Sequence, residues 1–163
     1  MFLRILVPTD GSPASEAAAQ AAIAFARGCG SQLVALSVAS PEPVALPTGA
    51  VLPDIDIDVQ LEQAEDAVHR IADAAAREGV DCAALTGYAY SAAGEIIDVA
   101  RRNRCDLIFI ATHGRRSLSR LFAGSVTQRV LAESAVPVMV YRAPLPREQR
   151  RADGHDASAA LGT

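Results

Sequence analysis

The chain has 163 residues, a length typical of one domain that can bury a core without disulfides or metals. Half of the residues are apolar and the formal net charge is −4 at pH 7, which excludes general attraction to nucleic acid or to an anionic membrane surface. No apolar run approaches membrane-spanning length, and the run before Pro8 is too short for a signal peptide. We therefore expect a cytoplasmic protein.

Apolar runs of strand length alternate with segments of helical pattern along residues 2–142. In chain order we expect a strand at 2–7, a helix at 13–27, a strand at 32–38, a helix at 56–78, a strand at 81–88, a helix at 92–102, a strand at 107–110, a helix at 125–133 and a strand at 136–141. Strands that are almost continuously apolar and are separated by helices predict a parallel sheet covered on both faces. Right-handed crossovers then make an α/β fold, doubly wound, with five strands and four helices on two faces.

Two segments do not fit this alternation. Residues 39–53 contain four prolines and a glycine, which predicts a loop without regular structure, acting either as a cover over a site or as a mobile segment. Residues 143–163 mix arginine and acids with Pro, Gly and Ala, so we expect a poorly ordered C-terminal tail. The predicted domain therefore comprises residues 1–142.

The basic residues are unevenly distributed. All fifteen are arginine, and seven of them fall within residues 101–129, which contain a single acid, Asp106, and so carry +6. Two interpretations remain open, a solvated arginine-rich surface and a local positive field that recruits an anion.

Residues 111–125 carry the strongest indication of a binding site. They join the end of an apolar strand to the start of a helix through a loop with three arginines and a glycine near each end. Unpaired N–H groups at a helix start favour an anion, and Gly124 has no side chain to block one. Ser125 and Gln128 have the spacing of a capping box, which predicts that Ser125 caps this helix. The alternative is an ordinary capped helix after a loop, in which His113 holds the loop rather than a ligand.

Several common chemistries are absent from the sequence. The first strand is not followed by Gly-x-Gly-x-x-Gly, a P-loop would need the lysine that the chain lacks, and there is no Gly-x-Ser-x-Gly nucleophile elbow. The three cysteines fit neither a disulfide framework nor a zinc site, so we expect small buried side chains and no metal centre.

Three segments together resemble the universal stress protein family. They are Ile5-Leu-Val-Pro-Thr-Asp-Gly-Ser12, then Ala111-Thr-His-Gly114 followed after nine residues by Gly124-Ser125, and Pro137-Val-Met-Val-Tyr-Arg142. The ATP-binding branch of that family has the pattern Gly-x-x-Gly, nine residues, Gly-Ser/Thr, and here Ala111 replaces the first glycine. The extra methyl group at this strand end is compatible with ATP, at lowered affinity.

The resemblance implies strand order 3-2-1-4-5 and a split nucleotide site. Asp10 would bind the ribose or adenine, with Pro8 and Thr9 lining that side, and the main chain of Val38 would meet the adenine. The implied phosphate half consists of Ala111, His113, Gly114, Arg115, Arg116, Gly124, Ser125, Val126 and Thr127. Mg²⁺ would accompany ATP as its counterion. The family also implies homodimers, which suits an apolar edge strand at Val136–Tyr141.

Three functions follow from these observations. The first is an ATP-binding regulatory protein of the stress response, and the second is an interaction module of the same fold that binds no nucleotide and acts through its dimer surface. Slow ATP hydrolysis ranks last, because Asp10 and His113 are the only evident candidates for a general base and no catalytic residue is assigned.

Overall fold

The computed structural model describes residues 1–41, 43–45, 51–53, 57–112 and 124–142, and the predicted tail lies outside this range. Its elements are β1 (Arg4–Thr9), α1 (Pro13–Cys29), β2 (Gln32–Ala39), β3 (Pro43–Ala45), β4 (Val51–Pro53), α2 (Ile57–Arg77), β5 (Cys82–Tyr88), α3 (Ala92–Arg102), β6 (Leu107–Ala111), α4 (Ser125–Glu133) and β7 (Val138–Tyr141). The strands and helices of the predicted alternation are all present, with ends shifted by one or two residues.

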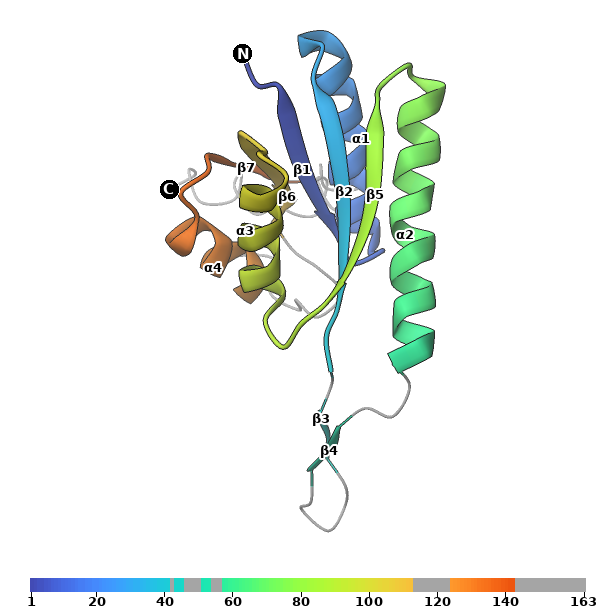
Figure 1. The fold of residues 1–163 in the computed structure, drawn as a ribbon, viewed down its shortest axis with the longest axis vertical. Coiled ribbons are helices and arrows are strands. Elements are labelled where there is room, and N and C mark those ends of the chain that lie inside the picture. The colour runs from blue at the N-terminus through green and yellow to red at the C-terminus, as the bar shows by residue number, and fades with distance from the viewer. Residues whose placement is uncertain (42, 46–50, 54–56, 113–123, 143–163) are drawn as a thin grey trace, which may run out of the picture.

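Five strands form one sheet in the order β5-β2-β1-β6-β7, and every pair in it is parallel (Figure 1). Counted along the chain without the two short strands β3 and β4, this is the order 3-2-1-4-5. The prediction of a doubly wound five-stranded parallel sheet is confirmed. The order reverses between β1 and β6, which is the position where such sheets bind ligands beyond the carboxyl ends of their strands.

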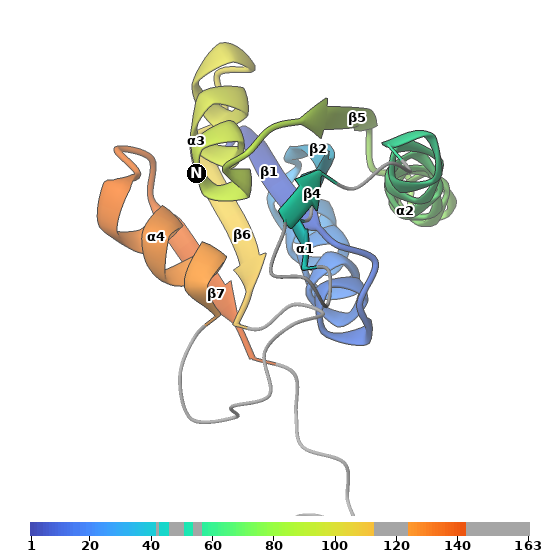
Figure 2. The ribbon, with the colours of Figure 1, turned by 90° about the horizontal axis from the view of Figure 1, so that it is seen from below.

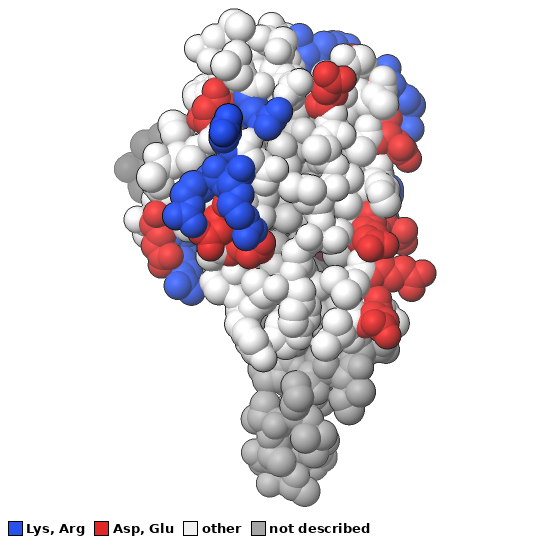
Figure 3. Space-filling view, in the orientation of Figure 1, with Lys and Arg blue, Asp and Glu red and all other residues white. Residues whose placement is uncertain are grey.

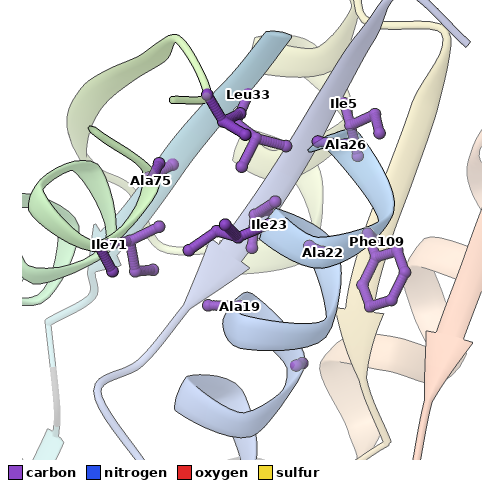
Figure 4. Close-up of a cluster of buried hydrophobic side chains, with 14 of the residues drawn as sticks. Ile5, Ala19, Ala22, Ile23, Ala26, Leu33, Ile71, Ala75 and Phe109 are labelled. Carbon is purple, nitrogen blue, oxygen red and sulfur yellow. The ribbon is translucent and has the colours of Figure 1, made fainter. Parts of the chain in front are cut away.

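The two faces of the sheet carry separate apolar cores, because successive side chains of a strand point to opposite faces. Ile5, Leu33 and Phe109 pack against α1 and α2 on one face (Figure 4). Leu6 and Ile108 pack with residues of α3 and α4 on the other face. Figure 2 shows the two helix pairs on either side of the sheet, seen from the carboxyl edge of β2.

Alanine-rich α1 explains the close packing of the first face. Its buried residues are mostly alanine, so the helix backbone can approach β1 and β6 closely. The helix begins where Ser12 caps the N–H of Ser15 and Pro13 occupies the first turn, as the sequence predicts. It ends at Gly30, whose φ of 68° is readily adopted by glycine.

The prediction of an irregular loop at residues 39–53 is wrong in part. Pro43–Ala45 and Val51–Pro53 pair as an antiparallel ribbon, in which Pro43 lies opposite Pro53. Both strands of a two-stranded ribbon are edge strands, where proline is tolerated because its missing N–H can face away from the ladder. The prolines therefore bound this short ribbon instead of preventing it.

Candidate functional site

The predicted site residues that the structure describes lie at the carboxyl edge of the sheet, around the ends of β1 and β6. The β1–β2 ladder pairs six residues, whereas the β1–β6 ladder consists of Ile5–Leu107 and Leu6–Ile108. The last three residues of β1 and of β6 thus extend past their shared ladder. The carboxyl ends of these two strands lie at the switch point, which is the expected ligand position in this fold.

The turn from β1 to α1 fixes the carboxylate of Asp10 at this edge. Oδ1 of Asp10 accepts a hydrogen bond from the N–H of Ser12 at 3.0 Å. Gly11 has a φ of 72°, a conformation strained for other residues, and its N–H donates to Oγ1 of Thr9 at 3.1 Å. The turn is therefore closed by side chains, and Asp10 is held beside the end of β1.

A buried hydroxyl cluster supports the turn from inside. Thr9 Oγ1 and Ser15 Oγ share a hydrogen bond at 3.0 Å, and Ser15 Oγ donates to the carbonyl of Ser12 at 2.9 Å. All three residues are buried. Sequence reasoning missed Ser15, although its three-residue spacing from the Ser12 cap is a signal that could have identified it.

The start of α4 is tied to the end of β6 by two hydrogen bonds. The N–H of Gly124 donates to the carbonyl of Thr112 at 2.7 Å, and Oγ1 of Thr127 donates to the carbonyl of Ala111 at 2.8 Å. Residues 113–123, which include His113, Gly114, Arg115 and Arg116, lie outside the described residues. Thr112 and Gly124, the described residues on either side of them, are joined by the first of these two hydrogen bonds.

The prediction that Ser125 caps α4 is wrong. Gly124 is the N-cap, with φ −59° and ψ 155°, and as a glycine it makes no side-chain cap bond. The bond from Gly124 to Thr112 fixes the cap one residue earlier than the capping-box spacing suggests, and Ser125 becomes the first helical residue.

The N-terminus of α4 differs electrostatically from the other helix starts. Helices α1 and α3 are capped by Ser12 and Ser91 and carry Glu16 and Glu95 in their first turns. The first turn of α4 contains no acid. Neither the side chain of its N-cap residue nor a carboxylate in its first turn thus offsets its positive dipole end, so this helix start is suited to an external anion.

The other predicted site residues lie at the same edge. Pro8 is the penultimate residue of β1, and Val38 is half-buried near the end of β2, where it packs toward α3. The methyl group of Ala111 belongs to the core on the α1 side, beside Phe109, and the residue is 6% exposed. Val126 is exposed on the first turn of α4.

The two arginines of the window that lie at the end of α3 are paired with acids. Arg101 pairs with Asp98 and Arg102 pairs with Glu95, at 2.9 and 2.6 Å. Both lie at the end of α3, at the amino edge of the sheet, opposite the site. Figure 3 shows basic side chains among acidic ones over α3. For this part of the window, the solvated-surface interpretation is correct.

Burial keeps two of the cysteine thiols protonated. Burial raises the pKa of the Cys105 thiol to about 11, and it also raises that of Cys82, so both thiols stay protonated near neutral pH. Within the described residues, no group of three histidine, cysteine or acidic side chains could hold a metal ion. None of the described helices is long and apolar enough to cross a membrane.

The topology defines an open, doubly wound α/β protein, a class of fold that binds its ligands at the carboxyl edge of the sheet, at the switch point. The model of the universal stress protein family matches residues 1–142, and the chain belongs to this family.

Two relatives agree with this assignment. The chain is 31% identical over 147 residues to universal stress protein MJ0531 of Methanocaldococcus jannaschii, covering 88% of this chain and 84% of that protein. It is 34% identical over 145 residues to the universal stress protein in the QAH/OAS sulfhydrylase 3′ region of Thermus aquaticus, covering 87% and 100%.

Solved structures share the fold. Universal stress protein UspA from Lactobacillus plantarum superimposes with a TM-score of 0.73 at 26% identity, covering 86% of this chain and 97% of that one. A universal stress protein in complex with cAMP gives 0.63 at 18% identity, covering 86% and 97%. The universal stress protein from Archaeoglobus fulgidus in complex with dAMP gives 0.57 at 20% identity, covering 85% and 96%.

Proposed function

We propose that this chain binds an adenine nucleotide, ATP with its Mg²⁺, and acts as a nucleotide-dependent regulatory protein of the stress response. One observation carries the proposal: the uncapped start of α4 is fastened to the end of β6, next to the β1–α1 turn that holds Asp10. An anion-binding helix start and a carboxylate thus flank the switch point from two sides.

The two halves suit opposite ends of a nucleotide. The carboxylate of Asp10 accepts hydrogen bonds from ribose hydroxyls but would repel phosphate, so the phosphates belong at α4. There the N–H groups of Ser125, Val126 and Thr127 would meet them, together with Gly114, Arg115 and Arg116 of the loop. The hydroxyl of Thr127 already donates to Ala111, so its contribution is the main-chain N–H. His113 would join this half.

The adenine half lies toward β2. Pro8 and Thr9 would line it, and the main chain of Val38 would meet the base. The neighbours in complex with cAMP and dAMP support an adenine nucleotide as the ligand class. Mg²⁺ would arrive bound to the phosphates of ATP.

We further propose that residues 1–142 act as a cytoplasmic homodimer joined through the last strand, with 143–163 as a tail outside the domain. The end of the sheet at β7 supports this, because all four residues of this edge strand are only partly buried. An apolar edge strand favours pairing with a second chain.

Mass spectrometry of nucleotide released from the purified full chain, followed by isothermal titration with Mg-ATP, tests the proposal. Released adenine nucleotide, or saturable binding of ATP, is the expected result. If the purified protein releases no nucleotide and does not bind ATP at millimolar-range concentration, the proposal is rejected. The interaction module would then remain, and it predicts a dimer that ATP does not affect.

A further inference from the structure

Ser37 in β2 is a buried hydroxyl for which the described residues offer no partner. Six polar residues are buried in the described part of the chain, and five of them make side-chain hydrogen bonds; the six are Thr9, Ser12, Ser15, Ser31, Ser37 and Thr127. Ser37 is 5% exposed and makes none within that part. An unpaired buried hydroxyl destabilises a fold. A ligand that forms a hydrogen bond with this hydroxyl would offset that penalty.

The strand register places Ser37 in the adenine half of the proposed site. Ser37 is paired with Thr9 of β1 and precedes Val38 in β2. Strand alternation puts the side chains of Ser37 and Thr9 on the same face of the sheet, about 5 Å apart. Thr9 in turn bonds to Gly11, which follows Asp10. Ser37 thus lies beside two residues assigned to the base.

The neighbourhood of Ser37 indicates a neutral ligand group. Its two cross-strand neighbours are Thr9 and Thr86, and no charged residue is buried in the described part of the chain. Burying a phosphate among hydroxyls alone would be strongly unfavourable, whereas a neutral ring with donors and acceptors matches a hydroxyl that can both donate and accept. Among the parts of a nucleotide, the base fits this chemistry.

We infer that the hydroxyl of Ser37 is a base-reading contact of the nucleotide site, left unpaired until the adenine ring binds. This inference rests on the proposed function and adds to it a side-chain contact in the adenine half, which otherwise relies on main-chain groups of Val38. It also explains why a buried polar residue occupies a position where alanine would satisfy the core.

Ser37→Ala tests the inference through two opposite changes. Without nucleotide, removal of the unpaired hydroxyl should raise the melting temperature by about 3 °C. The affinity for Mg-ATP should fall about fivefold, the loss of roughly one neutral hydrogen bond. Inorganic tripolyphosphate, which carries only the phosphate half, should bind both proteins equally.

Ser31→Ala is the matched control, because Ser31 is also 5% exposed but donates to the carbonyl of Phe2 at 2.7 Å. It lies before β2, at the amino edge, so its loss should lower the melting temperature and leave ATP affinity unchanged. If Ser37→Ala binds ATP as tightly as the unchanged protein, the inference is overturned and the proposed function stands. The same holds if the substitution weakens binding of tripolyphosphate as much as it weakens binding of ATP. Failure of the unchanged protein to bind ATP overturns both.

Discussion

The hydroxyl of Thr127 donates to the carbonyl oxygen of Ala111 at 2.8 Å, which joins the first turn of α4 to the last residue of β6. Thr127 is buried, so water does not replace this bond readily. The contact sets where the uncapped N–H groups of α4 lie relative to the β1–α1 turn. Together with the main-chain bond from Gly124 to Thr112, this side-chain hydrogen bond between residues sixteen positions apart fixes the geometry of the candidate site.

Thr127→Val should lower the free energy of unfolding by about 1–3 kcal/mol, because it leaves the buried carbonyl of Ala111 without this partner while the shape of the side chain is kept. ATP affinity should fall as well, since α4 loses a tie to β6. Urea unfolding and calorimetric titration measure the two effects. Thr86→Val, at an exposed position of β5, is the control and should change stability by less than about 0.5 kcal/mol. Equal unfolding curves for the two variants would contradict the prediction.

Gly124→Leu should weaken ATP binding at least about tenfold with little change in fold, because the side chain would extend where an anion approaches α4. The backbone of Gly124, at φ −59° and ψ 155°, is open to any residue, so strain does not confuse the result. Gly28→Leu is the matched control, since a Cβ added at Gly28 meets no atom beyond its own stretch of helix within 4 Å. Retained affinity in Gly124→Leu would place the phosphates elsewhere.

The fold could be predicted from the sequence because strand-length apolar runs and helix signals repeat along it. The β3–β4 ribbon could not, since Pro43 and Pro53 indicate a loop unless their positions at strand ends are known. The sequence predicts Ser125 as the cap because the capping-box spacing of side chains carries no information about the main-chain bond from Gly124 to Thr112.

The candidate site was predicted only where chemistry is local. The carboxylate of Asp10 and the missing side chain of Gly124 are visible in the sequence. The tie from Thr127 to Ala111 depends on how α4 docks against β6. The unpaired state of Ser37 depends on strand register and on every hydroxyl around it. These contacts join residues that are far apart in the chain, so no local sequence pattern predicts them.

Stability should fall above pH 9 because of Cys105. The unfolded thiol has its ordinary pKa of 9.0, while burial raises the pKa in the folded protein to about 11. Below pH 9 both states keep the proton. Between these values the unfolded chain loses a proton that the folded protein retains, so the free energy of unfolding falls as pH rises, by on the order of 2 kcal/mol. Urea unfolding at about pH 8 and about pH 10.5 measures this slope. Cys105→Ala should be flatter, and an unchanged slope would assign the effect to other groups.

Val140→Pro should dissociate the proposed dimer while the fold is kept. The carbonyls of Pro137 and Tyr141 accept bonds from Ile108 and Thr112 of the β6 segment, so by strand alternation Val138 and Val140 direct their main-chain groups to the free edge. Proline at Val140 removes an outward N–H, which should raise the dimer dissociation constant about tenfold or more. Sedimentation velocity measures the change. Val140→Thr keeps the N–H and should remain dimeric, whereas a dimeric proline variant would exclude pairing through this edge.

Ala111→Gly restores the glycine of the family pattern, yet it should leave ATP affinity within about twofold. The methyl group of Ala111 packs with Phe109 in the core on the α1 side, so its removal opens no space at the ligand. Stability should fall by about 1 kcal/mol, from the lost methyl and the greater freedom of glycine in the unfolded chain. Ala35→Gly, on the same sheet face but inside β2, controls for the effect of a destabilised strand on affinity. Titration with ATP and urea unfolding of both variants measure these effects. A tenfold gain in ATP affinity in Ala111→Gly but not in Ala35→Gly would mean that the methyl group of Ala111 faces the nucleotide.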